Sequence, residues 1–168
     1  MTEVQSYRVL ASHDGFETRV YPDHFLVSVD AEGDIAGSGN RAFGQLAGFI
    51  SGANHDRESI AMTAPVTQAK TPDGYRVSFV MPAKMEFPPV PLSPDLTVEA
   101  VSGVSRVAMQ FSGTASEKRF LKMAEKLKTK CAAIGIRVNS EPIFARYNGP
   151  WTPGPLRRNE VMFDLLHN

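Results

Sequence analysis

Two stretches of the sequence decide the fold: Phe25-Leu26-Val27-Ser28-Val29-Asp30 and Val107-Ala108-Met109-Gln110-Phe111. In both, apolar residues occupy every second position, which is typical of a β-strand with one face on a core. The apolar positions of the first stretch match those of the second at a constant spacing of 82 residues. Such self-similarity at one spacing indicates that the chain contains two copies of one structural unit.

The segments around the first stretch predict the other elements of the unit. Upstream, Asp14-Gly15 separates two β-prone runs, 7–10 and 16–21, and favours a tight hairpin because glycine accepts positive φ at no steric cost. Downstream, apolar residues at helical spacing predict a helix from about Gly39 to Phe49. Two further strands are expected at 60–66 and 75–81.

The second copy has the same order of elements. The capping-box pattern Thr114-Ala115-Ser116-Glu117 predicts the start of a helix that ends near Gly135. A proline-rich connector at 86–95 separates the two copies, because proline lacks the amide donor that a helix or central strand needs. The expected strands of the second copy lie at 96–101, 107–111, 143–147 and 160–166.

Two ββαββ units, at about 5–82 and 96–166, predict an α+β fold. We expect a pseudo-twofold, distorted β-barrel with antiparallel or mixed strands and two long helices packed on it. The 168 residues suffice for one core and are too few for two, so residues 1–168 are expected to form a single domain.

The composition narrows the class of protein. Eighteen basic residues balance eighteen acidic ones, so the basic excess of a nucleic-acid-binding domain is missing and no nucleic-acid partner is expected. The single cysteine, Cys131, excludes an internal disulfide. The chain start resembles no secretory signal, and no apolar run approaches the ~20 residues of a membrane span. We expect a soluble cytoplasmic protein without a membrane partner, as a monomer or weak homo-oligomer.

The first expected helix carries a strip of small side chains. Gly44 and Gly48 lie four residues apart, and inside a helix each costs ~1 kcal/mol relative to alanine. Asn40, Ala47 and Ser51 extend the strip. Either a flat ligand lies against this helix, or the helix packs closely on a strand or on a second chain.

Other chemistry finds little support. Nucleophile-elbow, P-loop and GxGxxG motifs are missing, so no catalytic centre is expected. No two of the four histidines have HxxxH or HExxH spacing, so no zinc site is expected either. Among the histidines, His24 is the best-placed candidate for an iron ligand. Arg157 either holds carboxylates of a ligand or pins its loop to the sheet. Four lysines at four-residue steps on the second helix form either a solvated face or a docking surface.

Several separated segments resemble the SOUL haem-binding protein family. The likeness covers about Tyr7 to Leu166, and the order of the motifs makes it specific. The segments are Ile60-Ala61-Met62-Thr63-Ala64-Pro65-Val66, Tyr75-Arg76-Val77-Ser78-Phe79-Val80-Met81-Pro82, Trp151-Thr152-Pro153 and Arg157-Arg158-Asn159-Glu160-Val161, with the opening 7–21 and the helix start Gly39-Asn40-Arg41-Ala42-Phe43.

The resemblance implies a pseudo-twofold barrel with two long helices, in agreement with the internal repeat. It also implies non-covalent binding of haem or another tetrapyrrole in a shallow apolar cleft beside the first helix. Arg41 is expected to pair with the propionates and His24 with the iron. The positions that match the family's cleft residues are Asn40, Phe43, Ala47 and Gly48, and Gly44 lies among them.

The sequence also departs from its relatives. Some family members carry a histidine, proposed as an axial ligand, where this chain has Val20. Others place basic and methionine side chains on the cleft helix, where this chain has the small, flat surface described above.

We therefore expect non-catalytic binding of a tetrapyrrole, in a carrier or buffer role. Three alternatives stay open. The chain could bind other flat or cationic organic molecules, because its duplicated unit also resembles the effector-binding domains of bacterial multidrug-responsive regulators. It could be an enzyme that degrades haem or hydrolyses a small ligand, or it could dock an acidic partner on the lysine row.

Overall fold

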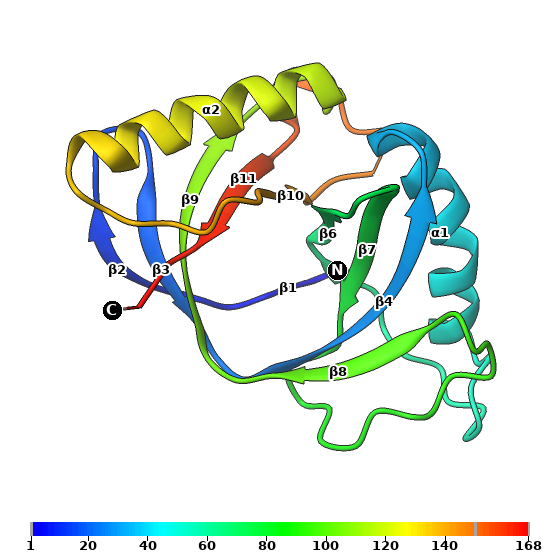
Figure 1. The fold of residues 1–168 in the computed structure, drawn as a ribbon. Helices are drawn as coiled ribbons and strands as arrows, with labels where there is room; N and C mark the ends of the chain where they lie inside the picture. Colours follow the sequence, from blue (N-terminus) through cyan, green and yellow to red (C-terminus); the bar gives the residue numbers. More distant parts are fainter. Residues whose placement is uncertain (1, 150, 168) are drawn as a thin grey trace.

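The computed structural model describes residues 2–149 and 151–167. Within these residues a nine-stranded antiparallel sheet curls into a half-barrel, and two long helices lie on its outside (Figure 1). The predicted α+β fold is confirmed. The sheet stays open, because its two edge strands do not pair with each other in the described part of the chain.

The elements follow one another in this order: β1 (Glu3–Val4), β2 (Arg8–Ser12), β3 (Glu17–Tyr21), β4 (His24–Glu32), α1 (Ile35–Ile50), β5 (Thr63–Ala64), β6 (Val66–Lys70), β7 (Gly74–Val80), β8 (Thr97–Val101), β9 (Val104–Phe111), α2 (Glu117–Ala133), β10 (Ile143–Arg146), a short 3₁₀ turn (Gly154–Leu156) and β11 (Asn159–Asp164).

The strand order β2-β3-β9-β11-β10-β6-β7-β4-β8 is symmetric about its middle. From the central β10–β6 pair, β11 and β9 follow on one side as β7 and β4 follow on the other. The strand that precedes each repeated stretch pairs with the repeated stretch of the other copy. Thus β3, which precedes β4, pairs with β9, and β8, which precedes β9, pairs with β4. This order is what a duplicated unit would produce, and the boundaries 5–82 and 96–166 stay a prediction.

The predicted hairpin at Asp14-Gly15 is confirmed. Strands β2 and β3 pair from Arg8 with Val20 to Ser12 with Glu17. Gly15 has φ +81°, a conformation in which a glycine costs the least.

Both helix starts differ from the predicted ones. Helix α1 begins at Ile35, because Asp34 caps it by accepting a 2.7 Å hydrogen bond from the amide of Gly37. Helix α2 is capped by Ser116, which accepts from the amide of Arg119, and not by Thr114. The buried Ile35 anchors the first turn of α1 to the core.

The predicted strand at 60–66 is wrong in its first part. Only Thr63–Ala64 and the residues from Val66 onward are strands. Ile60 is buried, and its amide donates to the carbonyl of Ile50 at the end of α1. Its apolar character therefore reflects packing under the helix end and not strand pairing.

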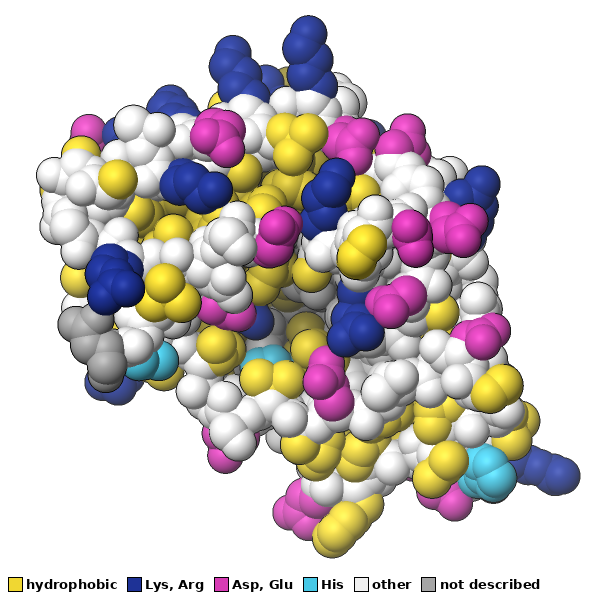
Figure 2. Space-filling model, viewed as in Figure 1, with side chains coloured by type: hydrophobic (Ala, Val, Ile, Leu, Met, Phe, Trp, Pro, Cys, Tyr) yellow, Lys and Arg dark blue, Asp and Glu magenta, His cyan; other side chains and the backbone are white. Residues whose placement is uncertain are grey.

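The core lies between the outer face of the sheet and the two helices. The apolar positions of both repeated stretches face it, and Val27 and Val107 are fully buried. The inner face of the half-barrel is mixed in character: it holds a buried Ser28–Ser78 hydrogen bond between β4 and β7 and a small apolar cluster of Tyr21, Ala108, Ala145 and Met162. Figure 2, in the same view as Figure 1, shows a hollow there, bordered by basic and acidic side chains and a histidine.

Candidate functional site

One face of α1 points away from the sheet and is nearly bare. A Cβ atom built on Gly44 or on Gly48 would meet nothing in the described chain within 4 Å. These glycines therefore do not serve close packing on a strand of this chain. The helix instead presents a flat surface that continues from Asn40 and Phe43 through Ala47.

A cleft of about 430 Å³ begins at the N-terminal half of this face. It separates α1 from the segment before α2 and from the loop between β10 and β11, so it brings together parts of the chain that are far apart in sequence. Its lining residues are Gly39, Asn40, Phe43, Val66, Thr114, Ala115, Arg146, Asn148, Gly149, Arg157 and Asn159.

The wall and rim of the cleft carry exposed aromatic side chains. Phe43 is 51% exposed, although its inner edge packs on Phe79 with ring centroids 5.7 Å apart. Trp151, 85% exposed, packs on Gly149, where an added Cβ would lie 2.5 Å from its ring. Large exposed apolar side chains beside a concavity indicate a binding surface.

Arg146 is the notable polar residue of the cleft. Its guanidinium donates to Oε1 of the buried Gln68, whose amide nitrogen donates to the carbonyl of Ile35 and to Ser38. Gly39 makes room for it, since a Cβ there would lie 3.0 Å from Arg146 Nη2. Burial lowers the pKa of Arg146, and no carboxylate of the described residues forms an ion pair with it.

Arg157 in the last loop has a place in both of the roles considered from sequence, whereas its neighbour Arg158 has neither. Arg157 lines the cleft, and its Nε also donates to the carbonyl of Thr152, which holds the loop together. Arg158 points to the other face of the sheet and donates to Glu160 with an N–O distance of 3.0 Å.

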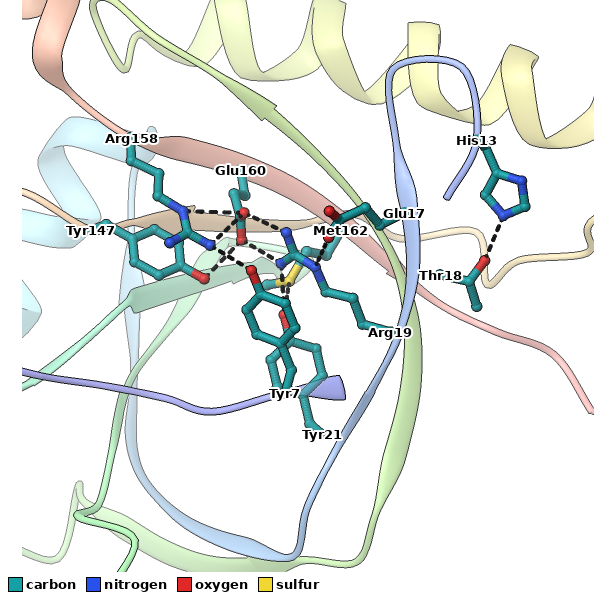
Figure 3. Close-up of polar contacts among 10 residues, drawn as sticks. All are labelled: Tyr7, His13, Glu17, Thr18, Arg19, Tyr21, Tyr147, Arg158, Glu160 and Met162. Carbon is teal, nitrogen blue, oxygen red and sulfur yellow. Dashed lines mark hydrogen bonds and ion pairs between the residues drawn. The ribbon is translucent and has the colours of Figure 1, made fainter. Parts of the chain in front are cut away.

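Glu160 is the centre of a buried polar cluster on the inner face (Figure 3). Arg19 binds its carboxylate with both terminal nitrogens at 2.8 Å. Arg158 approaches from the opposite side, and the hydroxyl of Tyr147 donates to the same carboxylate at 2.8 Å. Glu160 is fully buried, so this carboxylate exists as an anion only because of these donors.

A second layer of contacts surrounds Arg19. Its Nε donates to Glu17, and its Nη1 also donates to the hydroxyl of Tyr21 at 3.0 Å. Its guanidinium carbon lies 3.9 Å from the ring centroid of Tyr7, a cation–π contact. The cluster therefore joins the N-terminal segment to β3 and β11.

Both carboxylate oxygens of Glu160 already accept hydrogen bonds from the surrounding donors. Burial would raise the pKa of Glu160, but the hydrogen bonds and charges of Arg19 and Arg158 outweigh burial and hold that pKa below its ordinary value. Burial raises the pKa of Tyr147, which is thus a neutral donor. A carboxylate with all its acceptor sites engaged is poorly suited to act as a general base.

The depressed pKa of Glu160 predicts acid sensitivity. In the unfolded chain the carboxyl titrates near pH 4.3, so below about pH 5 the unfolded state binds more protons than the folded state. The stabilisation is fully present above the unfolded pKa and is lost as the pH falls through the folded pKa. Urea unfolding at pH steps from 7 to 3 should show the free energy of unfolding falling in the acid range. In Glu160→Gln the fall should be smaller, and parallel curves for the two proteins would contradict the assignment.

Residues 2–149 and 151–167 contain no group of three His, Cys, Asp or Glu side chains that could hold a metal ion. Neither α1 nor α2 is long and apolar enough to cross a membrane.

Comparison with known proteins shows to which family this chain belongs. The family model of the SOUL heme-binding protein matches residues 2–164, nearly the whole chain. This chain belongs to the SOUL family. The resemblance seen in the sequence motifs is thereby confirmed.

Curated relatives agree with this assignment, and solved structures show the same fold. Heme-binding protein 1 of Xenopus tropicalis is 27% identical over 158 residues, which cover 88% of this chain and 82% of that protein. The Xenopus laevis protein of the same name is also 27% identical. Among solved structures, the EcmrR C-terminal domain matches with a TM-score of 0.68 at 12% identity, covering 95% of this chain and 98% of that one. A hydrolase from Listeria innocua matches with a TM-score of 0.64 at 13% identity over 94% of each chain. At these identities the two structures show the fold alone.

Only some of the residues expected to form the tetrapyrrole site lie together in the structure. Asn40 and Phe43 line the cleft, and Gly44, Ala47 and Gly48 continue the same helix face. Arg41 lies outside the cleft lining, and its guanidinium donates to the carbonyl of Glu32. Its role as a propionate partner stays a prediction.

His24 lies apart from the α1 face. It shares the inner face of the sheet with Leu26, in a cavity of about 150 Å³, whereas Phe25 and Val27 point to the core under the helices. The Nδ1 atom donates to the carbonyl of Pro22 at 2.7 Å, which leaves Nε2 as the basic nitrogen. Burial lowers its pKa. Iron binding by His24 stays a prediction, and it would need a ligand on the other side of the sheet from the cleft.

Sequence reasoning missed Arg146. The one available clue is its register in β10, two residues after the buried Phe144 and therefore on the same face of the strand. An arginine at a core-facing strand position is unusual, and its neighbours Gly39 and Gln68 are recognisable only in three dimensions.

Proposed function

We propose that this SOUL protein binds haem or a related tetrapyrrole, without a covalent bond, in the cleft between α1 and the β10–β11 loop. One observation carries the proposal: the cleft continues into the bare face of α1, so a flat molecule finds both a concave and a planar apolar surface. The relatives named Heme-binding protein 1 support haem as the ligand.

The residues suggest how the ligand lies. The macrocycle would pack on Phe43 and along the face of Gly44, Ala47 and Gly48, where no side chain keeps a flat ring at a distance. Burial of apolar surface would supply most of the affinity. Haem, when bound, supplies its own redox and spectroscopic properties, and the chain contributes the surface and the orientation.

The proposed binding is non-covalent and non-catalytic. The only cysteine, Cys131, is buried on α2 and offers no thiol for attachment. The described residues that line the cleft include no histidine, cysteine or carboxylate. These features support a carrier or buffer role with a small-molecule partner. Glu160 on the inner face is already balanced by two arginines, so nothing favours a cationic ligand there.

A hemin titration followed at the Soret band tests the proposal. We expect saturable one-to-one binding to the wild-type protein and an affinity at least tenfold lower in Gly48→Leu. The leucine fills open space on the α1 face, and leucine is a better helix former than glycine, so the variant should fold normally.

Gln45→Leu is the matched control. Gln45 is an exposed residue of the same helix, but it lines a different depression, with Asp30 and Arg76. Its substitution should leave hemin binding unchanged. Weak, non-saturating association that is equal in all three proteins would overturn the haem site, and bilin formation with a reductant present would favour an enzyme instead.

A further inference from the structure

The charge of Arg146 is not balanced within the described chain. Two other well-buried arginines, Arg19 and Arg106, each have a carboxylate oxygen at 2.8 Å. Among the described residues Arg146 donates to Gln68, a neutral amide. It is half-buried at the base of an apolar cleft.

An unbalanced guanidinium in such a place is costly. A cation that leaves water without an opposite charge loses several kcal/mol of solvation, and a neutral amide compensates only part of this loss. An anion that enters the cleft would restore the balance. A carboxylate suits best, because the planar guanidinium can bind both of its oxygens.

The surroundings hold Arg146 in place for this role. Gly39 leaves space beside it, and Gln68, tied to the first turn of α1, fixes one terminal nitrogen. Asn148 and Asn159 border the same cleft and offer further polar atoms, while Phe43 supplies the apolar wall.

We propose that the cleft selects apolar organic acids and that Arg146 binds a carboxylate of the ligand. This inference rests on the proposed function for the apolar part of the ligand and adds what that function leaves open: recognition depends on the carboxylate. A neutral ester of the same macrocycle is therefore a poor ligand.

The test combines a change in the protein with a change in the ligand. The probes are mesoporphyrin IX and its dimethyl ester, both without a metal. Binding is followed by quenching of Trp151, the only tryptophan, which lies at the rim of the cleft. We expect wild type to bind the acid about 10- to 100-fold more tightly than the ester, the range of a charge-assisted hydrogen bond. Arg146→Gln should lower acid binding to the ester level and leave ester binding unchanged.

Equal loss of both probes in Arg146→Gln would mean that Arg146 only shapes the cleft, and would overturn the proposal. Equal binding of acid and ester to wild type, unaffected by the variant, would overturn it while leaving the proposed function intact. If neither probe binds wild type, the proposed function itself fails. Loss of acid binding in Arg41→Gln but not in Arg146→Gln would move the carboxylate site to the start of α1.

Arg76→Gln provides the matched control. Arg76 lies on β7 outside the cleft, in an exposed ion pair with Asp30. Arg76→Gln removes one positive charge from the protein, as Arg146→Gln does. Binding of both probes should be the same as in wild type. Arg146→Lys adds a second comparison, because it keeps the charge without the planar fork and should recover only part of the preference for the acid.

Discussion

Replacing Glu160 by glutamine should lower the free energy of unfolding by about 3 kcal/mol, a large fraction of the stability of a domain this size. The substitution keeps the shape of the side chain but removes the buried negative charge between Arg19 and Arg158. Arg19 would retain Glu17, which is partly exposed, and Arg158 would retain the hydroxyl of Tyr7. The buried Arg19 and the half-buried Arg158 would then face each other without the anion that separates them.

Urea unfolding monitored by circular dichroism at neutral pH gives the measurement. Asp30→Asn is the matched control, because it makes the same change of carboxylate to amide in an ion pair whose members are 52% and 55% exposed. Exposed pairs contribute less than about 1 kcal/mol. Equal losses in the two variants would show that the inner cluster is no stronger than a surface pair.

Two glycine-to-alanine substitutions should change stability in opposite directions. A Cβ on Gly74, in β7, would overlap the carbonyl oxygen of Ala31 and lie 2.8 Å from Cα of Glu32 in β4. Backbone atoms cannot give way as a flexible side chain can, so Gly74→Ala should cost about 3 kcal/mol. Gly44→Ala meets open space and should stabilise the protein by about 1 kcal/mol, the difference in helix propensity.

The pair is measured by thermal and urea unfolding of both variants beside wild type. Destabilisation by Gly44→Ala would mean that something absent from the isolated chain covers α1, such as a second copy. A neutral Gly74→Ala would mean that β4 and β7 separate more easily than their seven-residue pairing suggests.

These stability effects bear on function. A protein that gains stability when Gly44 or Gly48 is replaced has kept glycine there for another reason. A flat ligand on α1 is such a reason, and Gly48→Leu should combine a stable fold with weak hemin binding. Stability and binding measured on the same variants therefore separate packing from ligand contact.

Much of the architecture follows from local patterns. Alternation in the two repeated stretches indicated the strands and the duplication, because side chains of a strand alternate between faces whatever their partners are. The Asp14-Gly15 turn and the apolar stripes of both helices are equally local. The helix starts were harder to predict from the sequence, because Asp34 and Ser116 act as caps only once the following turn is packed on the core.

The sequence by itself determined most of the strands, the two helices, the strip of small residues on α1 and the membership of the SOUL family. Only the tertiary structure decided which of the candidate residues meet. It placed Arg146 beside Gly39, turned Arg157 to the cleft and Arg158 to Glu160, and put His24 on the opposite side of the sheet. The reason is physical: period and propensity act between neighbours in the chain, whereas a cleft and its charge balance arise from contacts between segments more than a hundred residues apart.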